Sequence, residues 1–207
     1  WDVALAQWKH SLTLQGAVAY ALALLVSKLL HELAHAYVAT AQGVRVGHMG
    51  VALLVLWPMP YTDTGESWKL GLARQRLAIA SAGIAAELAL AAWTTLAWSF
   101  LPDGPLRTAC LFLATTAWLL TLAVNASPFM RFDGYFMLAD AVDTPGLHER
   151  AGTLARAHLR RLLFGLRETA SEGGSRARRM AMVTFAYTTW MYRLVVFFGI
   201  ALLVYHV

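Results

Sequence analysis

Four long apolar stretches constrain what this chain can fold into more than any other feature of its sequence. They run over about residues 12–41, 77–101, 106–126 and 182–207. Because a helix needs about 20 mostly apolar residues to cross a bilayer, each stretch is long enough for one crossing. Only 14% of the residues are charged, where a soluble domain carries about 25%. The sequence therefore predicts an all-α polytopic membrane protein with about four transmembrane helices in a single domain, residues 1–207.

Two segments between these stretches differ in composition. Residues 44–61 combine β-branched residues with glycines and end in a Pro-x-Pro pattern, which indicates a short β-strand or two, or a re-entrant segment. Such backbone survives at membrane depth only where protein or a water-filled cavity covers it. Residues 145–175 carry arginines among leucines and alanines. That pattern favours an amphipathic helix on the cytoplasmic membrane surface, and a solvated helix is the alternative.

The positive charges of the chain lie mostly between the apolar stretches. The formal net charge is +5, which in a soluble protein could indicate nucleic-acid binding. Here the lysines and arginines concentrate in the loops after the first and third stretches, and flanking charge of this kind sets membrane orientation. We therefore expect the lipid bilayer and no nucleic acid as a partner, with these loops in the cytoplasm and both termini outside.

The single cysteine and the first residue bear on two further features. Cys110 lies in an apolar stretch, so we expect it to pack there, and neither an intrachain disulfide nor a cysteine-based zinc site can form. The sequence starts at Trp1, which indicates a processed chain or part of a longer protein. We expect no removable signal peptide, because no basic segment and cleavage site precede the first stretch.

The first apolar stretch contains the motif His-Glu-x-x-His, at His31, Glu32 and His35. Residues i and i+4 of a helix share a face, so the two imidazoles can bind one metal ion, and Glu32 can act as general base on a metal-activated water. Ionisable residues inside a span are costly and by default functional, and a polar cluster binding neighbouring helices is the alternative. His35 lies about six residues from the cytoplasmic end, hence about 9 Å below that face.

Asp133 is the best candidate for a third metal ligand. A catalytic zinc ion usually has three protein ligands, and the motif supplies two. Asp133 follows the third stretch on the same side of the membrane as the histidine pair, in a segment that Pro128 and Gly134 mark as irregular. Its neighbours are aromatic, and a carboxylate among aromatic rings needs a charge partner. We therefore predict a Zn²⁺ ion bound by His31, His35 and Asp133.

The two motifs together resemble the site-2 protease family of intramembrane zinc metalloproteases. The second motif of that family is matched, in order and spacing, by Asn125, Pro128, Asp133 and Gly134. Phe132 and Tyr135 depart from the common form of this motif. The resulting sequence, Phe-Asp-Gly-Tyr, resembles that of a bacterial branch of the family, the peptide zinc metalloproteases, which is associated with peptide maturation or export. The resemblance covers most of the chain.

This resemblance implies a role for each motif residue. His31, His35 and Asp133 would bind zinc, and Glu32 would be the general base. Asn125 would hydrogen-bond the substrate backbone or the developing oxyanion, and capping of the third stretch is an equally open role for it. The departure at Tyr135 bears on substrate preference and leaves the metal chemistry intact.

The resemblance also implies an activity and a location. The protein would be a zinc metalloendopeptidase of the bacterial inner membrane, with its active site toward the cytoplasmic face. Its partners would be a peptide or transmembrane protein substrate, and a peptide-export system or fused accessory domains. The alternatives are a non-catalytic metal-binding membrane subunit of a peptide maturation or export system, and a metal-transporting channel. The sequence leaves the substrate and the cleaved bond open.

Glu87 is a further carboxylate inside an apolar stretch, the second one. It could approach the metal or hydrogen-bond a ligand imidazole. It could equally be protonated and bonded to a neighbouring helix. These roles stay open on the sequence alone.

Two ion pairs are expected elsewhere in the chain. Lys28 lies one helical turn before Glu32, which favours an i, i+4 pair between them. Asp63 lies in the strand-like segment, where pairing with Arg74 or Arg76 is expected.

Overall fold

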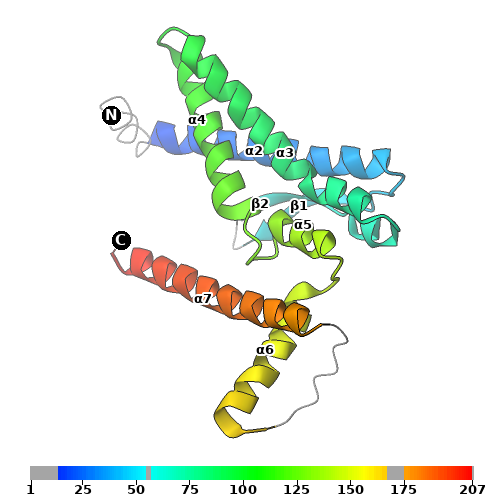
Figure 1. The fold of residues 1–207 in the computed structure, drawn as a ribbon. Helices are drawn as coiled ribbons and strands as arrows, with labels where there is room; N and C mark the ends of the chain where they lie inside the picture. The colour runs from blue at the N-terminus through cyan, green and yellow to red at the C-terminus, as the bar shows by residue number, and fades with distance from the viewer. Residues whose placement is uncertain (1–13, 55–56, 167–174, 207) are drawn as a thin grey trace.

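The computed structural model describes residues 14–54, 57–166 and 175–206, and this part of the chain is mostly helical (Figure 1). Four of its helices are long and apolar enough to cross a membrane. They are α2 (Leu14–Ala41), α3 (Ala73–Phe100), α4 (Pro105–Leu119) with the π-helical turn η2 (Leu120–Asn125) that continues it, and α7 (Arg176–His206). The predicted all-α architecture with four spans is confirmed. Helices α3 and α7 begin earlier than predicted because arginine-containing turns precede their apolar parts.

Residues at four-residue intervals, several of them small, form the buried faces of α2 and α3. The buried face of α2 contains Ala23, Ser27, His31, His35 and Ala39, and that of α3 contains Ile79, Gly83, Glu87 and Ala91. Rows at this spacing on both helices favour a steep crossing of about 50°, and the two helices cross steeply in Figure 1. Small side chains allow close approach of helices in lipid, where little hydrophobic force drives helices together.

The strand-like segment forms an antiparallel hairpin of β1 (Met49–Leu54) and β2 (Trp57–Thr62). Its strand content was predicted, and a short 3₁₀ helix, η1 (Gly65–Lys69), follows it. The Thr62 hydroxyl donates to the carbonyl oxygen of Glu32 at 3.0 Å. The hairpin is therefore attached to α2 at the residue predicted as the general base.

The two prolines of β2 fit the hairpin because of their register. The Asp63 amide donates to the carbonyl of His48 at 2.8 Å, so backbone groups at every second residue before Asp63 also face β1. Pro58 and Pro60, opposite Leu53 and Val51, alternate with those residues and face away from β1. Each proline therefore removes no hydrogen bond from the ladder.

A short helix that the sequence analysis did not predict, α5 (Asp133–Ala141), follows η2 and an irregular segment. Asp133 is its first residue. A Cβ atom at Gly134 would lie 2.5 Å from the carbonyl carbon of Ala126, so only glycine allows α5 to lie this close to the end of η2. Gly134 thus marks a close approach of two backbone segments rather than the irregular backbone that was predicted there.

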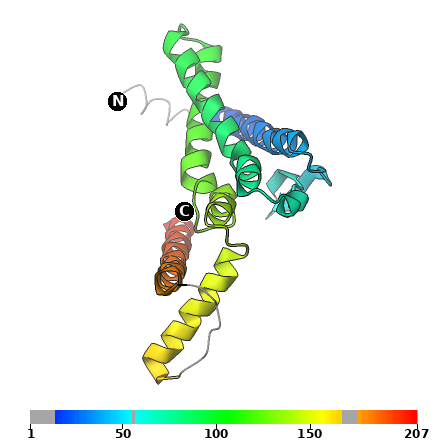
Figure 2. The ribbon, with the colours of Figure 1, turned by 45° about the vertical axis from the view of Figure 1, so that its right-hand side comes forward.

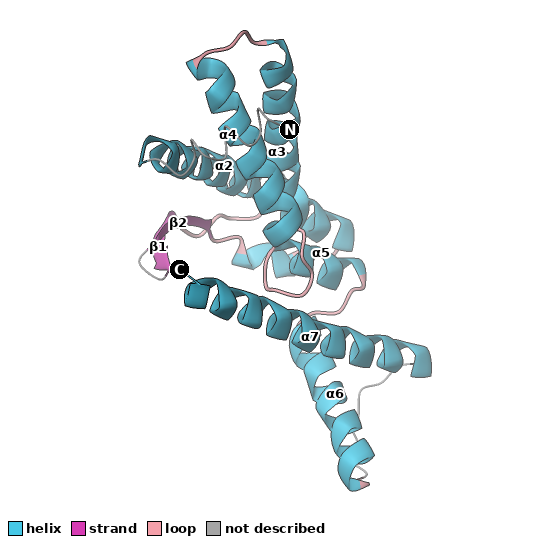
Figure 3. Cartoon of the chain, turned by 90° about the vertical axis from the view of Figure 1, so that its left-hand side faces the viewer, coloured by secondary structure: helices cyan, strands magenta, loops and turns pink. Residues whose placement is uncertain are grey.

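Helices α5, α6 (Leu147–Phe164) and α7 share a separate apolar core. It contains Tyr135 and Ala139 of α5, four residues of α6, and Met182, Val183 and Ala186 of α7. Figures 2 and 3 show α6 extending away from α2, α3 and α4, with α7 packed against its first half. The helix predicted within residues 145–175 is present, and its end exposes Leu162, Leu163 and Phe164. Its position on a membrane surface stays a prediction.

Candidate metal centre

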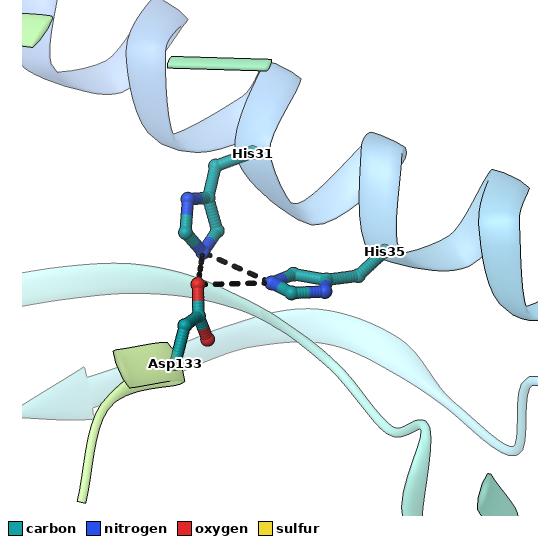
Figure 4. A group of neighbouring side chains, drawn as sticks. All are labelled: His31, His35 and Asp133. Carbon is teal, nitrogen blue, oxygen red and sulfur yellow. Dashed lines mark hydrogen bonds and ion pairs between the residues drawn. The ribbon is translucent and has the colours of Figure 1, made fainter. Parts of the chain in front are cut away.

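His31, His35 and Asp133 bring one ligand atom each to a common point (Figure 4). Nε2 of His31 lies 3.0 Å from Oδ2 of Asp133, and Nε2 of His35 lies 3.2 Å from the same oxygen. The two Nε2 atoms are 3.2 Å apart. Helix α2 supplies both histidines from successive turns, and the first residue of α5 supplies the carboxylate across from them. The structure thus brings together the three residues predicted as zinc ligands.

The other nitrogen of each imidazole faces an acceptor. Nδ1 of His35 lies 2.8 Å from the carbonyl oxygen of Ile79 on α3, so this nitrogen carries the hydrogen. Nδ1 of His31 lies 3.0 Å from Oε1 of Glu87, in a close contact that is not aligned as a full hydrogen bond. Both rings therefore favour the tautomer whose Nε2 lone pair points to the common point, as in a metal ligand.

The three ligand atoms fit a zinc ion. A zinc ion about 2.1 Å from each of them would set neighbouring ligands about 3.4 Å apart, close to the separations observed. A proton on either Nε2 satisfies one contact with Asp133, whereas a cation at the centre satisfies all three atoms. Burial raises the pKa of the Asp133 carboxyl, but hydrogen bonds from His31 and His35, in the forms that carry a hydrogen on Nε2, outweigh it and hold that pKa well below its usual range. Asp133 is therefore ionised, which is the form that binds metal.

Gly83 of α3 forms the wall behind the two imidazoles. A Cβ atom at this position would lie 2.5 Å from Nε2 of His31 and 2.5 Å from Nε2 of His35. Only glycine leaves room for both rings. The sequence analysis missed this residue, although an isolated glycine inside a helical apolar stretch usually has a packing or functional reason.

Glu87 lies on the buried side of the site, with none of its surface exposed. Lys28 Nζ lies 3.0 Å from its Oε1. The Thr121 hydroxyl and the Asn125 amide donate to its Oε2 at 2.7 Å and 2.6 Å. Of the roles left open for Glu87, the geometry favours contact with a ligand imidazole.

The prediction of an ion pair between Lys28 and Glu32 is wrong. Lys28 is buried on the face of α2 that meets α3, where Glu87 is its partner. Glu32 is half-buried and lines a cleft instead. The helical spacing allows an ion pair, but Lys28 lies at the contact with α3 and Glu32 lies at the cleft.

The cleft has a volume of about 690 Å³ and reaches two of the candidate metal ligands. Glu32, His35 and Asp133 line it together with residues of β2, η1 and α5. The general-base candidate and two of the metal ligands are therefore accessible from one side. Asn125 is buried and, among the described residues, is not one of those lining the cleft.

The predicted pairing of Asp63 with Arg74 or Arg76 is also wrong. Arg76 bonds to Asp140 at 2.9 Å and to Asp143 at 2.8 Å, because the first turn of α3 faces the end of α5. Asp63 accepts a hydrogen bond from the amide of Gly65 at 2.9 Å. Its carboxylate shapes the turn after β2.

A metal group beside a glutamate-lined cleft, within helices long enough to span a bilayer, is typical of an intramembrane metallopeptidase. The comparison with protein families agrees. The model of peptidase family M50 matches residues 19–195, most of the chain, and the protein belongs to that family. The resemblance to site-2 proteases is thereby confirmed, and so, at the level of the family, is an intramembrane metalloprotease. Comparisons with curated proteins and with solved structures give no match.

Proposed function

We propose that this protein is a zinc metalloendopeptidase that hydrolyses peptide bonds of membrane-embedded or membrane-associated substrates. The observation that carries the proposal is the convergence of two Nε2 atoms and one carboxylate oxygen beside a cleft that Glu32, His35 and Asp133 line. A bound zinc ion would lower the pKa of a water molecule and polarise the scissile carbonyl. His31, His35 and Asp133 would hold that ion.

Glu32 takes the proton of the attacking water and delivers it to the leaving amine. Its backbone is held by α2 and by the hydroxyl of Thr62, so its side chain starts from a fixed position at the edge of the cleft. Asn125 donates one amide hydrogen to Glu87. The oxyanion contact predicted for Asn125 stays a prediction that requires its second amide hydrogen.

The variant Glu32→Gln tests the reaction. It should still bind about one zinc ion per chain, while cleavage of a membrane substrate falls by roughly 10²–10⁴-fold, the usual contribution of general acid–base catalysis. His31→Ala and Asp133→Ala should lose the zinc as well. Undiminished cleavage by Glu32→Gln would end the proposal.

A transmembrane helix hides its carbonyl groups in its own hydrogen bonds, so a substrate has to unwind before cleavage. We propose that the unwound segment pairs with the hairpin as an added strand. The outer edge of β1 supports this, because Met49, Val51 and Leu53 direct both N–H and C=O groups away from β2. The outer edge of β2 lacks N–H groups at Pro58 and Pro60.

The register supplies a matched pair of variants for this proposal. Val51→Pro removes an outward N–H and leaves the ladder intact, whereas Ala52→Pro removes a hydrogen bond to Met59 within the hairpin. Val51→Pro should raise KM several-fold with zinc content and melting temperature unchanged. Ala52→Pro should in addition lower the melting temperature. An unchanged KM in Val51→Pro would exclude pairing at this edge.

The alternative function, a non-catalytic metal-binding subunit of an export system, has no observation in its favour. A structural metal site needs no carboxylate beside a cleft, and Glu32 provides one. A transporter of metal ions would require further ligand sets along a path. Zinc content fixed near one ion per chain, without flux into liposomes, would disfavour transport.

A further inference from the structure

The carboxylate of Glu87 has no part in the proposed reaction, yet it occupies the centre of the helix packing. It is completely buried on α3, within a predicted membrane span. An ionisable group in such a place is costly and is retained where a function requires it.

Both oxygens of Glu87 are occupied, and the two oxygens have different partners. Oε2 accepts hydrogen bonds from Thr121 and Asn125 of η2 at 2.7 Å and 2.6 Å. Oε1 lies 3.0 Å from Nζ of Lys28 and 3.0 Å from Nδ1 of His31, both on α2. The carboxylate is thus fixed from the α4 side and presents its other oxygen to a metal-ligand ring.

We propose that Glu87 is a positioning residue that holds His31 in the tautomer and orientation required of a metal ligand, and that Asn125 and Thr121 hold Glu87. This inference rests on the metal centre of the proposed function. A carboxylate facing Nδ1 keeps the hydrogen on that nitrogen and leaves the Nε2 lone pair directed at Asp133. On this view the amide of Asn125 acts on the metal centre through Glu87 and His31.

A purely structural role is the competing explanation, in which Glu87 only neutralises Lys28. The two roles predict different effects of Glu87→Gln. The glutamine amide oxygen would turn to its donors Thr121 and Asn125, which leaves the NH₂ group facing Nδ1 of His31. That NH₂ group would favour the opposite tautomer, with a hydrogen on Nε2 where the metal binds.

The test uses the full chain in detergent and measures zinc affinity by chelator competition, together with the visible spectrum of the Co²⁺ form. Glu87→Gln should weaken zinc binding by about 10–100-fold, the usual effect of losing such a partner, and should alter the Co²⁺ spectrum. Wild-type affinity with an unchanged spectrum would overturn the inference.

A double variant separates positioning from charge neutralisation. Glu87→Gln alone leaves the buried Lys28 without its charge partner and should lower the melting temperature. Lys28→Met with Glu87→Gln removes both members of the ion pair, so the melting temperature should return toward that of the wild type. Zinc affinity should stay low, because no carboxylate faces His31. Recovery of zinc affinity in the double variant would show that Glu87 serves Lys28 alone.

Asn125→Ala provides a graded comparison. It removes one of the two donors to Oε2 and leaves Glu87 in place, so zinc affinity should fall less than in Glu87→Gln. The readouts that decide the inference are of metal binding. A wild-type chain that binds no zinc would contradict the proposed function, whereas equal binding by wild type and Glu87→Gln would contradict this inference alone.

Discussion

Two regions of this molecule bury different kinds of side chain. The region of α2, α3, α4 and the start of α5, called here the metal region, buries a polar network that includes Lys28, His31, His35, Glu87 and Asn125. The core shared by α5, α6 and α7, called the apolar core, buries Leu, Met, Val, Ala and one Tyr. Polar contacts and small residues can hold helices together in lipid, whereas apolar burial needs water to act against. The comparison assigns metal binding to one region and the packing of apolar side chains to the other.

The largest expected effect comes from one methyl group added in the metal region. Gly83→Ala places a Cβ atom 2.5 Å from both ligand Nε2 atoms, so at least one ring must move, and we expect zinc affinity to fall by at least about 10-fold. Gly199→Ala on α7 is the control, because within the described part of the chain no atom outside the adjoining turns of its own helix lies within 4 Å of its added Cβ. The zinc affinity and the melting temperature of Gly199→Ala should match or exceed those of the wild type. Normal zinc binding in Gly83→Ala would refute the close approach of α3 to the rings.

The reverse change tests the apolar core. Ala155 on α6 is fully buried there, so Ala155→Leu should overpack the contact with α7 and destabilise the fold by about 1–3 kcal/mol. Zinc affinity should be unchanged, because α6 supplies no metal ligand. The melting temperature in detergent and a chelator titration give the two readouts. A large loss of zinc binding would mean that the regions are coupled more tightly than their contacts indicate.

A smaller effect is expected where Arg76 joins α3 to α5. Asp140 has a side chain 25% exposed and Asp143 one 79% exposed, and both bond to Arg76. Asp140→Asn should destabilise by about 1 kcal/mol, since it weakens a partly buried charged hydrogen bond. Asp143→Asn should have an effect near zero, as exposed ion pairs usually do. Equal effects on the melting temperature would contradict this ranking.

The smallest effect concerns pH. His148 lies stacked between Tyr135 and Phe185, and burial, then the charges of Arg193 and Arg131, lower its pKa below 6.5. The unfolded chain takes up a proton at this residue at a higher pH than the folded chain does. Stability is therefore complete above about pH 6.5 and falls as the pH drops toward the folded pKa.

His148→Phe keeps a ring in the stack and removes the titration. Melting temperatures measured between about pH 8 and about pH 5 should decline less in this variant than in the wild type. Parallel declines would show that other groups cause the acid sensitivity.

The two regions also differ in how far the sequence alone predicted them. The metal ligands were predictable because the spacing of His31 and His35 carries chemical meaning, and a distant motif pointed to Asp133. The spans followed from hydropathy, and the hairpin from its glycines and prolines. The contact between Lys28 and Glu87 was not predictable, because it depends on which faces of α2 and α3 meet.

The segment after α4 shows the limit most clearly. Gly134 was interpreted as a sign of irregular backbone, but it serves a close approach to Ala126 and lies within α5. Tyr135 departs from the common motif, and the structure places it in the apolar core, where its hydroxyl accepts a hydrogen bond from the amide of His148. Such contacts join residues distant in sequence or separated by unpredictable turns, so local patterns do not contain them.

The anchor of His35 has a consequence for how this site could change over evolutionary time. Its Nδ1 hydrogen is accepted by a main-chain carbonyl, that of Ile79, which every amino acid at that position would supply. His31 relies on the side chain of Glu87, which a single substitution can alter. A substitution can therefore remove the acceptor of His31, whereas none at residue 79 removes the main-chain carbonyl that accepts from His35. Drift in metal affinity among descendants of this chain should be recorded at residue 87 and its two η2 donors, while residue 79 would keep this carbonyl whichever apolar side chain packs there.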